Sequence, residues 1–385
     1  MVMVDGTATL VIDLGNSDTR VLTEFGVNGK GKVRRKLSVL SNRYGILPED
    51  KIDVYLTNQI YSEEDSSIFK LEGDHWCNGD ICLTELTSTT QRPSALHKKY
   101  NSLPSKLSIM NGLKRGYEDV AEFADCDLTS VNVSWDLVLL LPPEDVDEGA
   151  KQIAELARTI DNIEFLMPEL KKDISINSIN VYPEGFCAYI AVVFESKKKI
   201  RKSHAYLVEP TETTLIADIG AGTTDFTVAK GGKIITSTRF TRAIGGNNVH
   251  RRVGKLLRER GISLPENFIR EGTETGFVRS GSKEYDIKEE IATAKRDVSK
   301  QLVDAVEEFF EDNMIPIQSI NNLLLCGGGA MESDVEGIEP IADYITDFIT
   351  SISPNIRRVE LPEDENGEKL SPRLLNVIGA GILSE

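Results

Sequence analysis

The chain has 385 residues, of which 40% are hydrophobic and 27% are charged, and its formal net charge is −17. This length and apolar content can build full cores in two or three domains, which excludes a single small module and a wholly disordered chain. The acidic balance argues against a protein that coats nucleic acid directly. No apolar run approaches the ~18 residues of a membrane span and no basic segment opens the chain, so neither a membrane protein nor a signal peptide is expected.

The five cysteines are an odd number in a long chain, which favours free thiols in a reducing cytoplasm over a disulfide framework. His75, Cys77 and Cys82 lie close together and raise the question of a metal site. Structural zinc sites usually pair two short spacings, and the sequence offers no second pair. Half-buried thiols on a strand–turn–strand are therefore the favoured interpretation.

The first half of the chain opens with a predicted buried strand at 8–14, a turn, and a second strand near Val21. Five basic residues fall among the seven at 30–36, a pattern typical of a solvated edge. Residues 40–130 are irregular and polar, with short strand-like pieces, and indicate an inserted subdomain. A strand at 134–141 stops at two prolines, and helical spacing follows at 147–160.

The second half alternates strands and helices. A strand is predicted at 174–182 and a helix at about 184–194, followed by a polar segment at 195–213 that looks like a linker. A strand–turn–strand spans 214–229, and helices follow at 249–260 and 286–312. A strand at 322–326 runs into three glycines, and an apolar helix closes the chain at 374–383. This alternation predicts the α/β class.

An internal repeat connects the two halves. Residues 10–22 read LVIDLGNSDTRVL and residues 215–227 read LIADIGAGTTDFT, and they superimpose without a gap at an offset of 218 − 13 = 205. Asp13 meets Asp218, and the glycine and threonine that follow also coincide. Two buried strands often look alike by chance, but the same Asp, Gly and Thr at the same offsets do so rarely. Duplication of one structural unit is therefore expected.

Each copy of the repeat places a carboxylate at the end of a buried strand, where open α/β sheets bind their ligands. The glycine lets backbone approach a ligand closely, and successive N–H groups in a tight turn bind anions. Two such hairpins facing each other across a cleft could bind a polyphosphate from both sides. Asp13 and Asp218 would hold Mg²⁺ through water, because that ion dehydrates reluctantly. The alternative is a pair of glycine turns in which Asp is only a turn former.

A third glycine cluster follows the strand at 322–326, at Gly327, Gly328 and Gly329. Three consecutive glycines are entropically costly, and the close approach of something flat, such as adenine or ribose, would offset that cost. A simple hairpin turn is the alternative. No GxxxxGK[ST] motif occurs, which excludes a P-loop enzyme.

Together these segments resemble the actin/DnaK-type chaperone/sugar-kinase superfamily of ATPases. IDLGNSDTR and LIADIGAGTTDFT resemble its two phosphate loops, LLLCGGGA its adenosine motif, and VYPEGFCAY and NVIGAG its two connecting helices. The motifs occur in the expected order along nearly the whole chain. The resemblance implies a duplicated actin-like (RNase H-like) α/β fold, with two domains and inserted subdomains around a nucleotide cleft.

The resemblance also implies domain boundaries. Domain I would cover 1–210, with its core at 1–30 and 131–210 and an inserted subdomain at about 31–130. Domain II would cover 211–385, with its core at 211–246 and 290–370 and an insertion at about 247–289. The C-terminal helix at 371–385 would return to domain I.

Within the superfamily the chain is most similar to the bacterial ParM/StbA-type actins that segregate plasmids. It is too short for a chaperone with its substrate-binding domain, sugar kinases usually run longer, and it lacks the basic amphipathic end of a membrane-tethered division protein. Three local features carry the resemblance: VLLLPPE, Pro183-Glu184-Gly185, and Asn376-Val377-x-Gly379.

Residue roles follow from the same resemblance. Asp13 would hold Mg²⁺ through water, Asp218 would orient the metal and the attacking water, and Glu184 would position that water. Arg20 stands where many relatives have a lysine that contacts phosphate, a departure because Arg is a planar fork and Lys a point charge. The other expected nucleotide-binding residues are Gly15, Asn16, Ser17, Asp18, Thr19, Gly220, Ala221, Gly222, Thr223, Thr224, Gly245, Gly246, Lys288, Glu289, Gly327, Gly328 and Gly329. An ordinary charged helix face explains Lys288 and Glu289 nearly as well, and a loop before a helix explains Gly245 and Gly246.

The implied activity is hydrolysis of ATP, or alternatively GTP, with Mg²⁺ in the cytoplasm, with Glu184 and Asp218 as catalytic residues. It would be coupled to filament assembly and disassembly, and a DNA-binding adaptor would link the filament to a plasmid, with no direct contact to nucleic acid or membrane. The alternatives are a small-molecule kinase or phosphotransferase of the same fold and a non-polymerising nucleotide-binding regulator. The basic clusters at 30–36 and 197–202 are candidates for filament contacts or an acidic partner, although such clusters are more often plain solvated surface.

Overall fold

The computed structural model describes residues 3–26, 33–58, 66–79, 81–82, 98–312, 315–331, 335–364 and 366–385. The chain forms two compact units, Met1–Pro183 with Ala380–Glu385 (unit 1) and Glu184–Gly379 (unit 2). Residues 184–210, expected in the first domain, lie in unit 2. The reason is packing, because Tyr189, Val192 and Leu207 belong to one apolar cluster with Ile216 and Leu324 of the unit 2 sheet.

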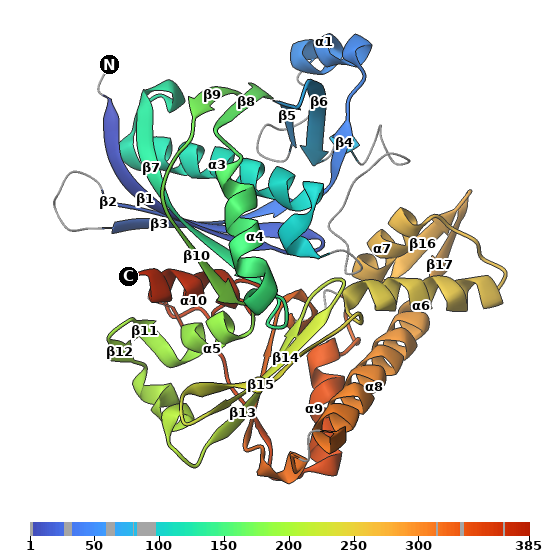
Figure 1. Ribbon diagram of the computed structural model, residues 1–385. Helices are drawn as coiled ribbons and strands as arrows, with labels where there is room; N and C mark the ends of the chain where they lie inside the picture. Colours follow the sequence, from blue (N-terminus) through green and yellow to red (C-terminus); the bar gives the residue numbers. More distant parts are fainter. Residues whose placement is uncertain are drawn as a thin grey trace. The chain divides into compact units, whose positions relative to one another are not determined.

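Unit 1 is built on a five-stranded sheet in the order β10-β7-β1-β2-β3 (Figure 1). The strands are β1 (Val4–Leu14), β2 (Asp18–Gly26), β3 (Val33–Ser41), β7 (Val131–Leu141) and β10 (Ser175–Pro183). β1 runs antiparallel to β2 and parallel to β7, and β10 is parallel to β7. β3 lies in the expected inserted subdomain but pairs with β2 in the main sheet.

A 22-residue helix, α3 (Leu103–Ala124), packs on β1 and β2. The sequence did not predict it, because its buried side carries polar residues such as Ser108, Asn111 and Asp119 that obscure the apolar period. Gly112 and Gly116 let the helix approach the sheet, since a Cβ there would lie 2.8 Å from Ile12 and Trp135 respectively. The helix thus closes the core of unit 1.

A second sheet of unit 1 has the order β4-β6-β5-β8-β9. Its strands are β4 (Tyr44–Ile46), β5 (Ser66–Leu71), β6 (Asp74–Gly79), β8 (Asn162–Met167) and β9 (Glu169–Asp173). Because β8 and β9 complete it, the small subdomain draws on residues beyond the expected 31–130. Unit 1 also contains α1 (Glu49–Asn58), η1 (Lys99–Asn101), η2 (Leu128–Ser130) and α4 (Val146–Arg158).

The thiols of Cys77 and Cys82 are buried in this small subdomain, with their Sγ atoms 3.3 Å apart. Their mutual hydrogen bond and burial raise the pKa of Cys82 far above its ordinary value. Within the described part of the chain, no three His, Cys, Asp or Glu side chains gather so as to hold a metal ion. Both thiols are buried side by side, as small apolar groups commonly are.

Unit 2 is built on a five-stranded sheet in the order β15-β14-β13-β18-β19; Figure 1 labels β13, β14 and β15 of it. The strands are β13 (Thr213–Ile219), β14 (Thr224–Lys230), β15 (Lys233–Arg242), β18 (Asn322–Cys326) and β19 (Arg357–Arg358). Leu215, Ala217 and Ile219 pack in the main core with the long helices, whereas Ile216 packs with α5 on the opposite face. Asp218 shares the face of Ile216 because strand side chains alternate.

The helices of unit 2 are α5 (Phe186–Val193), α6 (Gly246–Glu259), α7 (Glu266–Thr275), α8 (Lys288–Asp312) and α9 (Ile341–Ile352). A hairpin of β16 (Phe277–Ser280) and β17 (Lys283–Asp286) follows α7. The short elements are β11 (Phe194–Ser196), β12 (Lys199–Ile200), η3 (Lys202–Val208), η4 (Ile317–Ser319) and η5 (Gly328–Ala330). The first three occupy the expected linker at 195–213. Helix α10 (Leu375–Ser384) closes the chain.

The main sheet of unit 1 and the five-stranded sheet of unit 2 share one topology. Each has a central strand with an antiparallel hairpin on one side and two parallel strands on the other. The register is also the same at an offset of 205, since Asp13 faces Arg20 and Asp218 faces Asp225. The duplicated α/β fold predicted from the sequence repeat is confirmed.

The basic cluster at 30–36 is largely engaged within unit 1 over its described residues. Arg35 forms ion pairs of 2.7 Å with both Glu24 and Glu385, and Lys36 pairs with Glu122. Lys30 and Lys32 lie outside the described residues. None of the helices in the described part of the chain has the length and apolar character that a membrane span requires.

Candidate functional site

The first loop, residues 13–20, begins at the end of β1 with Asp13, which is fully buried. One carboxylate oxygen, Oδ2, accepts a 2.8 Å hydrogen bond from Nη1 of Arg20, the residue opposite it on β2. The other oxygen, Oδ1, has no hydrogen-bond partner among the described residues. A buried carboxylate oxygen without a partner fits a site that receives a cation or its bound water.

Asn42, just beyond β3, holds the first loop in place. Its backbone N–H donates to the Ser17 carbonyl at 3.1 Å, and its side-chain Nδ2 donates to the Gly15 carbonyl at 2.5 Å. Its Oδ1 accepts the hydroxyl of Thr19. Asn42 is fully buried and contacts three loop residues at once, yet no sequence pattern marked it as functional.

A second layer supports Asn42. The Ser108 hydroxyl of α3 lies 3.0 Å from Asn42 Oδ1, and the Tyr44 hydroxyl lies 3.1 Å from Ser108 Oγ. Burial raises the pKa of the Tyr44 phenol well above its ordinary value, so that hydroxyl stays protonated and available as a donor. The polar face of α3, which hid this helix from sequence analysis, therefore braces the first loop.

The second loop begins with Asp218, which is 5% exposed. Its Oδ2 accepts a 2.5 Å hydrogen bond from Nδ2 of Asn376 in α10. The Oδ1 atom of Asn376 accepts the backbone N–H groups of Gly185 at 2.9 Å and Ala188 at 3.2 Å. Glu184, which directly precedes Gly185, is itself buried, so one asparagine side chain holds both the Asp218 carboxylate and the backbone next to Glu184.

The glycine cluster at 327–329 packs against the second loop. A Cβ on Gly327 would lie 2.4 Å from Asp218 Oδ1, and one on Gly329 would lie 2.4 Å from Ile219. Gly327 also has φ of 83°, which favours glycine. Internal packing thus explains two of the three glycines. Only Gly328 faces open space, since a Cβ there would meet no atom of the described residues within 4 Å.

Gly245 and Gly246 also border the second loop. The Gly246 N–H donates to the Gly220 carbonyl at 3.0 Å, and a Cβ on Gly245 would lie 2.5 Å from the same oxygen. These glycines open helix α6, whose next residue, Asn247, donates its N–H to the Ala221 carbonyl at 2.7 Å. The loop carbonyls are therefore held by a helix N-terminus.

The two equivalent threonines, Thr19 and Thr224, both turn their hydroxyls inward. Thr19 donates to Asn42, and Thr224 donates to the Ile244 carbonyl at 2.8 Å. A hydroxyl carries one hydrogen, so neither has a donor left for a phosphate. Ser17 and Gly222 of the two loops are half-buried and Thr223 is 8% exposed.

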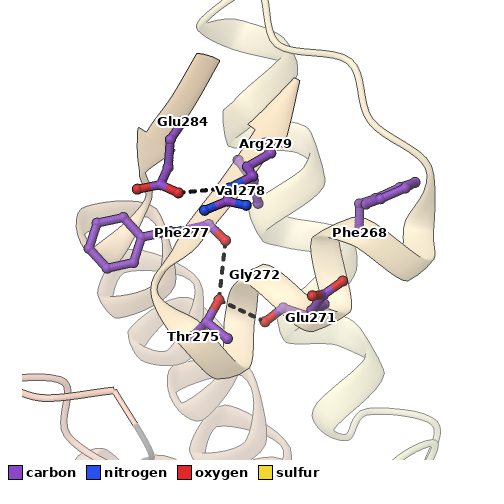
Figure 2. A pocket seen from close by; sticks show the side chains of 8 residues that line it. All are labelled: Phe268, Glu271, Gly272, Thr275, Phe277, Val278, Arg279 and Glu284. Carbon is purple, nitrogen blue, oxygen red and sulfur yellow. Dashed lines mark hydrogen bonds and ion pairs between the residues drawn. The ribbon is translucent and has the colours of Figure 1, made fainter. Parts of the chain in front are cut away.

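Lys288 and Glu289 open helix α8, directly after the β16–β17 hairpin in sequence. The Lys288 Nζ lies 5.6 Å from the ring centroid of Phe277, and Glu289 is exposed. None of the predicted site residues lines the nearby pocket of about 400 Å³ shown in Figure 2. That pocket is lined by Phe268, Glu271, Gly272, Thr275, Phe277, Val278, Arg279 and Glu284. An ion pair of 2.8 Å joins Arg279 and Glu284 in this lining.

Comparison with known proteins identifies the fold. The family described as the C-terminal part of archaeal MreB-like actin homologues matches residues 216–336, about a third of the chain. The archaeal actin homologue Ta0583 superimposes with a TM-score of 0.67 at 14% identity, covering 98% of this chain and 99% of that one. The chain has the actin fold.

ParM structures agree with this assignment. The 15-stranded ParM filament from Clostridium botulinum gives a TM-score of 0.65 at 15% identity, over 97% of this chain and 98% of that one. Bacillus thuringiensis ParM with ATP gives 0.60 at 14% identity, over 98% of both chains. A search of curated protein sequences finds no match. The resemblance to actin homologues close to ParM is confirmed at the level of the fold.

Proposed function

We propose that this chain is an actin-like ATPase that binds ATP and Mg²⁺ and assembles into filaments. One observation carries the proposal: the two sheets place a buried aspartate at the same register position, Asp13 in unit 1 and Asp218 in unit 2. Similar folds include a ParM with ATP and a ParM filament, which supports a nucleotide-dependent polymer.

Asp13 and Asp218 would hold Mg²⁺ through water, and the orphaned Oδ1 of Asp13 fits such a ligand shell. When bound, the ion would neutralise phosphate charge. The backbone of the two loops would bind the phosphates, with Arg20 as a charged donor. Gly328, with open space beside it, is the best placed of its cluster to border the adenosine.

Glu184 and Asp218 would orient the water that attacks the γ-phosphate, and the Glu184 carboxylate would accept its proton. Most of the rate enhancement in such a transfer comes from positioning and electrostatics. The cytoplasm is the expected compartment, where the five cysteines, which form no disulfide in the structure, remain reduced. Plasmid segregation through a DNA-binding adaptor is the cellular role proposed for the filament.

The proposal is tested by measuring phosphate release and light scattering together in the presence of ATP and Mg²⁺. Electron microscopy then shows whether filaments have formed. We expect scattering to rise as filaments form and phosphate release to follow. E184A should slow phosphate release by about 100-fold while assembly persists. Phosphorylation of a small molecule without any assembly would favour the kinase alternative, and nucleotide binding without either would favour the regulator. GTP in place of ATP measures the nucleotide preference.

A further inference from the structure

Asn376 is the side chain that connects the predicted catalytic carboxylate of Asp218 to the backbone that directly follows Glu184. It lies on α10, is 4% exposed, and makes three hydrogen bonds with its amide group. Two of them end on backbone N–H groups at the start of α5, directly after Glu184. The third ends on the Asp218 carboxylate, 158 residues away in the sequence.

The orientation of the amide follows from its partners. Gly185 and Ala188 present N–H donors, so the atom facing them must be the carbonyl Oδ1. The NH₂ group is then left to donate to Asp218 Oδ2. A flipped amide would place a carbonyl against a carboxylate and an NH₂ against two N–H groups, which is repulsive at all three contacts.

The second loop needs a donor such as the Asn376 NH₂ group because two negatively charged carboxylates face each other there. In the first loop a guanidinium faces the aspartate, but the residue opposite Asp218 in the sheet is Asp225. Like charges directly opposite each other on a sheet are destabilising. Asp225 Oδ1 accepts the Thr241 hydroxyl at 2.5 Å, and Asp218 Oδ2 accepts from Asn376. A neutral amide therefore fixes one of two neighbouring carboxylates.

The close approach that makes these contacts possible is set by Gly379, three residues further along α10. A Cβ at Gly379 would lie 1.7 Å from the Cys187 carbonyl oxygen and 3.0 Å from the Ala191 nitrogen. The backbones of α10 and α5 thus touch where only glycine fits. Residues three apart lie on the same face of a helix, so the contact at Gly379 also brings Asn376 to α5.

We infer that Asn376 is a positioning residue that orients the Asp218 carboxylate and fixes it relative to Glu184. The inference rests on the proposed ATPase function. It separates two roles of one side chain: the Oδ1 atom caps the start of α5, and the Nδ2 atom orients Asp218.

Two substitutions distinguish these roles. N376D keeps an oxygen for the two N–H groups of α5, and a carboxylate suits a helix N-terminus, but it removes the donor to Asp218. N376A removes both. A positioning role predicts that kcat falls about 100-fold in N376D, at least as far as in N376A, with little change in KM. A purely structural cap predicts the opposite order, with N376D close to the parent chain.

Asn322 provides a matched control. It is fully buried in the same unit, its Nδ2 donates to Glu212 at 2.7 Å, and its Oδ1 accepts from Arg357 at 2.7 Å. N322D therefore makes the same chemical change beside another carboxylate, outside the proposed site. We expect N322D to lower the melting temperature but to leave kcat unchanged.

The experiment measures kcat and KM for ATP, the dissociation constant of a fluorescent ATP analogue, and thermal unfolding for all four proteins. Loss of kcat in N376D with retained analogue binding and folding supports the inference. Parent-like kcat in N376D, or an equal loss in N322D, overturns the inference and leaves the ATPase proposal intact. Absence of turnover in the parent chain overturns the ATPase proposal, and the positioning role falls with it.

Discussion

The two loops share their aspartate, glycine and threonine at equivalent positions, but different neighbours compensate the charge of the aspartate. Asp13 pairs with a guanidinium across its own hairpin. Asp218 faces Asp225 across the equivalent hairpin and accepts a hydrogen bond from a distant amide. The first loop is thus neutralised locally, whereas the second brings two carboxylates together and depends on α10.

The anchoring of the loops differs in the same way. Asn42 holds the first loop from within unit 1, 27 residues from Gly15. The second loop is held by the start of α6 and by Asn376. Duplicated hairpins can therefore keep one register while different residues hydrogen-bond to their loops. The reason is that the donors for a loop can come from any element that packs beside it.

The largest difference between the loops should appear when each aspartate charge is removed in turn. D13N takes away the carboxylate that faces the Arg20 guanidinium, whose side chain is 11% exposed, and should cost about 3 kcal/mol of unfolding free energy. D218N removes one of two facing carboxylates and should leave stability unchanged or raise it. Urea denaturation measures both.

A double substitution sharpens that comparison. Combining D13N with R20M removes both charges of the pair, so part of the lost stability should return. Equal destabilisation by D13N and D218N would show that the two loops are compensated alike, contrary to the contacts described above.

G379A should destabilise the protein about as much as D13N. The added methyl meets a backbone carbonyl that cannot move aside, so we expect a loss of about 3 kcal/mol and a lower kcat as Asn376 shifts from Asp218. G26A serves as a control, because a Cβ there meets no atom of the described residues within 4 Å. Thermal unfolding and steady-state hydrolysis test the pair, and parent-like kcat in a folded G379A would contradict the expectation.

N42A should affect the first loop alone. It leaves the half-buried Gly15 carbonyl without its side-chain donor and should cost about 2 kcal/mol, with weaker nucleotide binding. S108A removes only one contact to Asn42 and should cost less. Titration with a fluorescent ATP analogue measures the affinity, and unchanged affinity in N42A would mean that the first loop keeps its shape without this anchor.

The smallest effects should come from T19V and T224V. Both hydroxyls donate inward, so each substitution should cost about 1 kcal/mol of stability. Nucleotide affinity should change little once the loss of stability is taken into account. A large loss of affinity without a loss of stability would show instead that these hydroxyls contact phosphate.

Several parts of this protein were predictable from local sequence. The repeat at an offset of 205 predicted two hairpins of the same register, because alternation of buried side chains fixes which residues face each other. The glycine motifs marked places of close approach, and the helix after Glu184 was correctly predicted. The long helix α3 was missed, since its buried polar residues break the apolar period.

Other features were decided only by the tertiary structure. Asn42 looks like an ordinary polar residue in the sequence, and Asn376 stood out only as part of a family motif without a role. The importance of both lies in hydrogen bonds to loops far along the chain. Gly327 and Gly329 suggested a ligand, but their neighbours are Asp218 and Ile219 of the same chain. A local pattern shows which conformation a segment prefers. Which donor meets which carboxylate depends on packing between elements, and that is set by the fold as a whole.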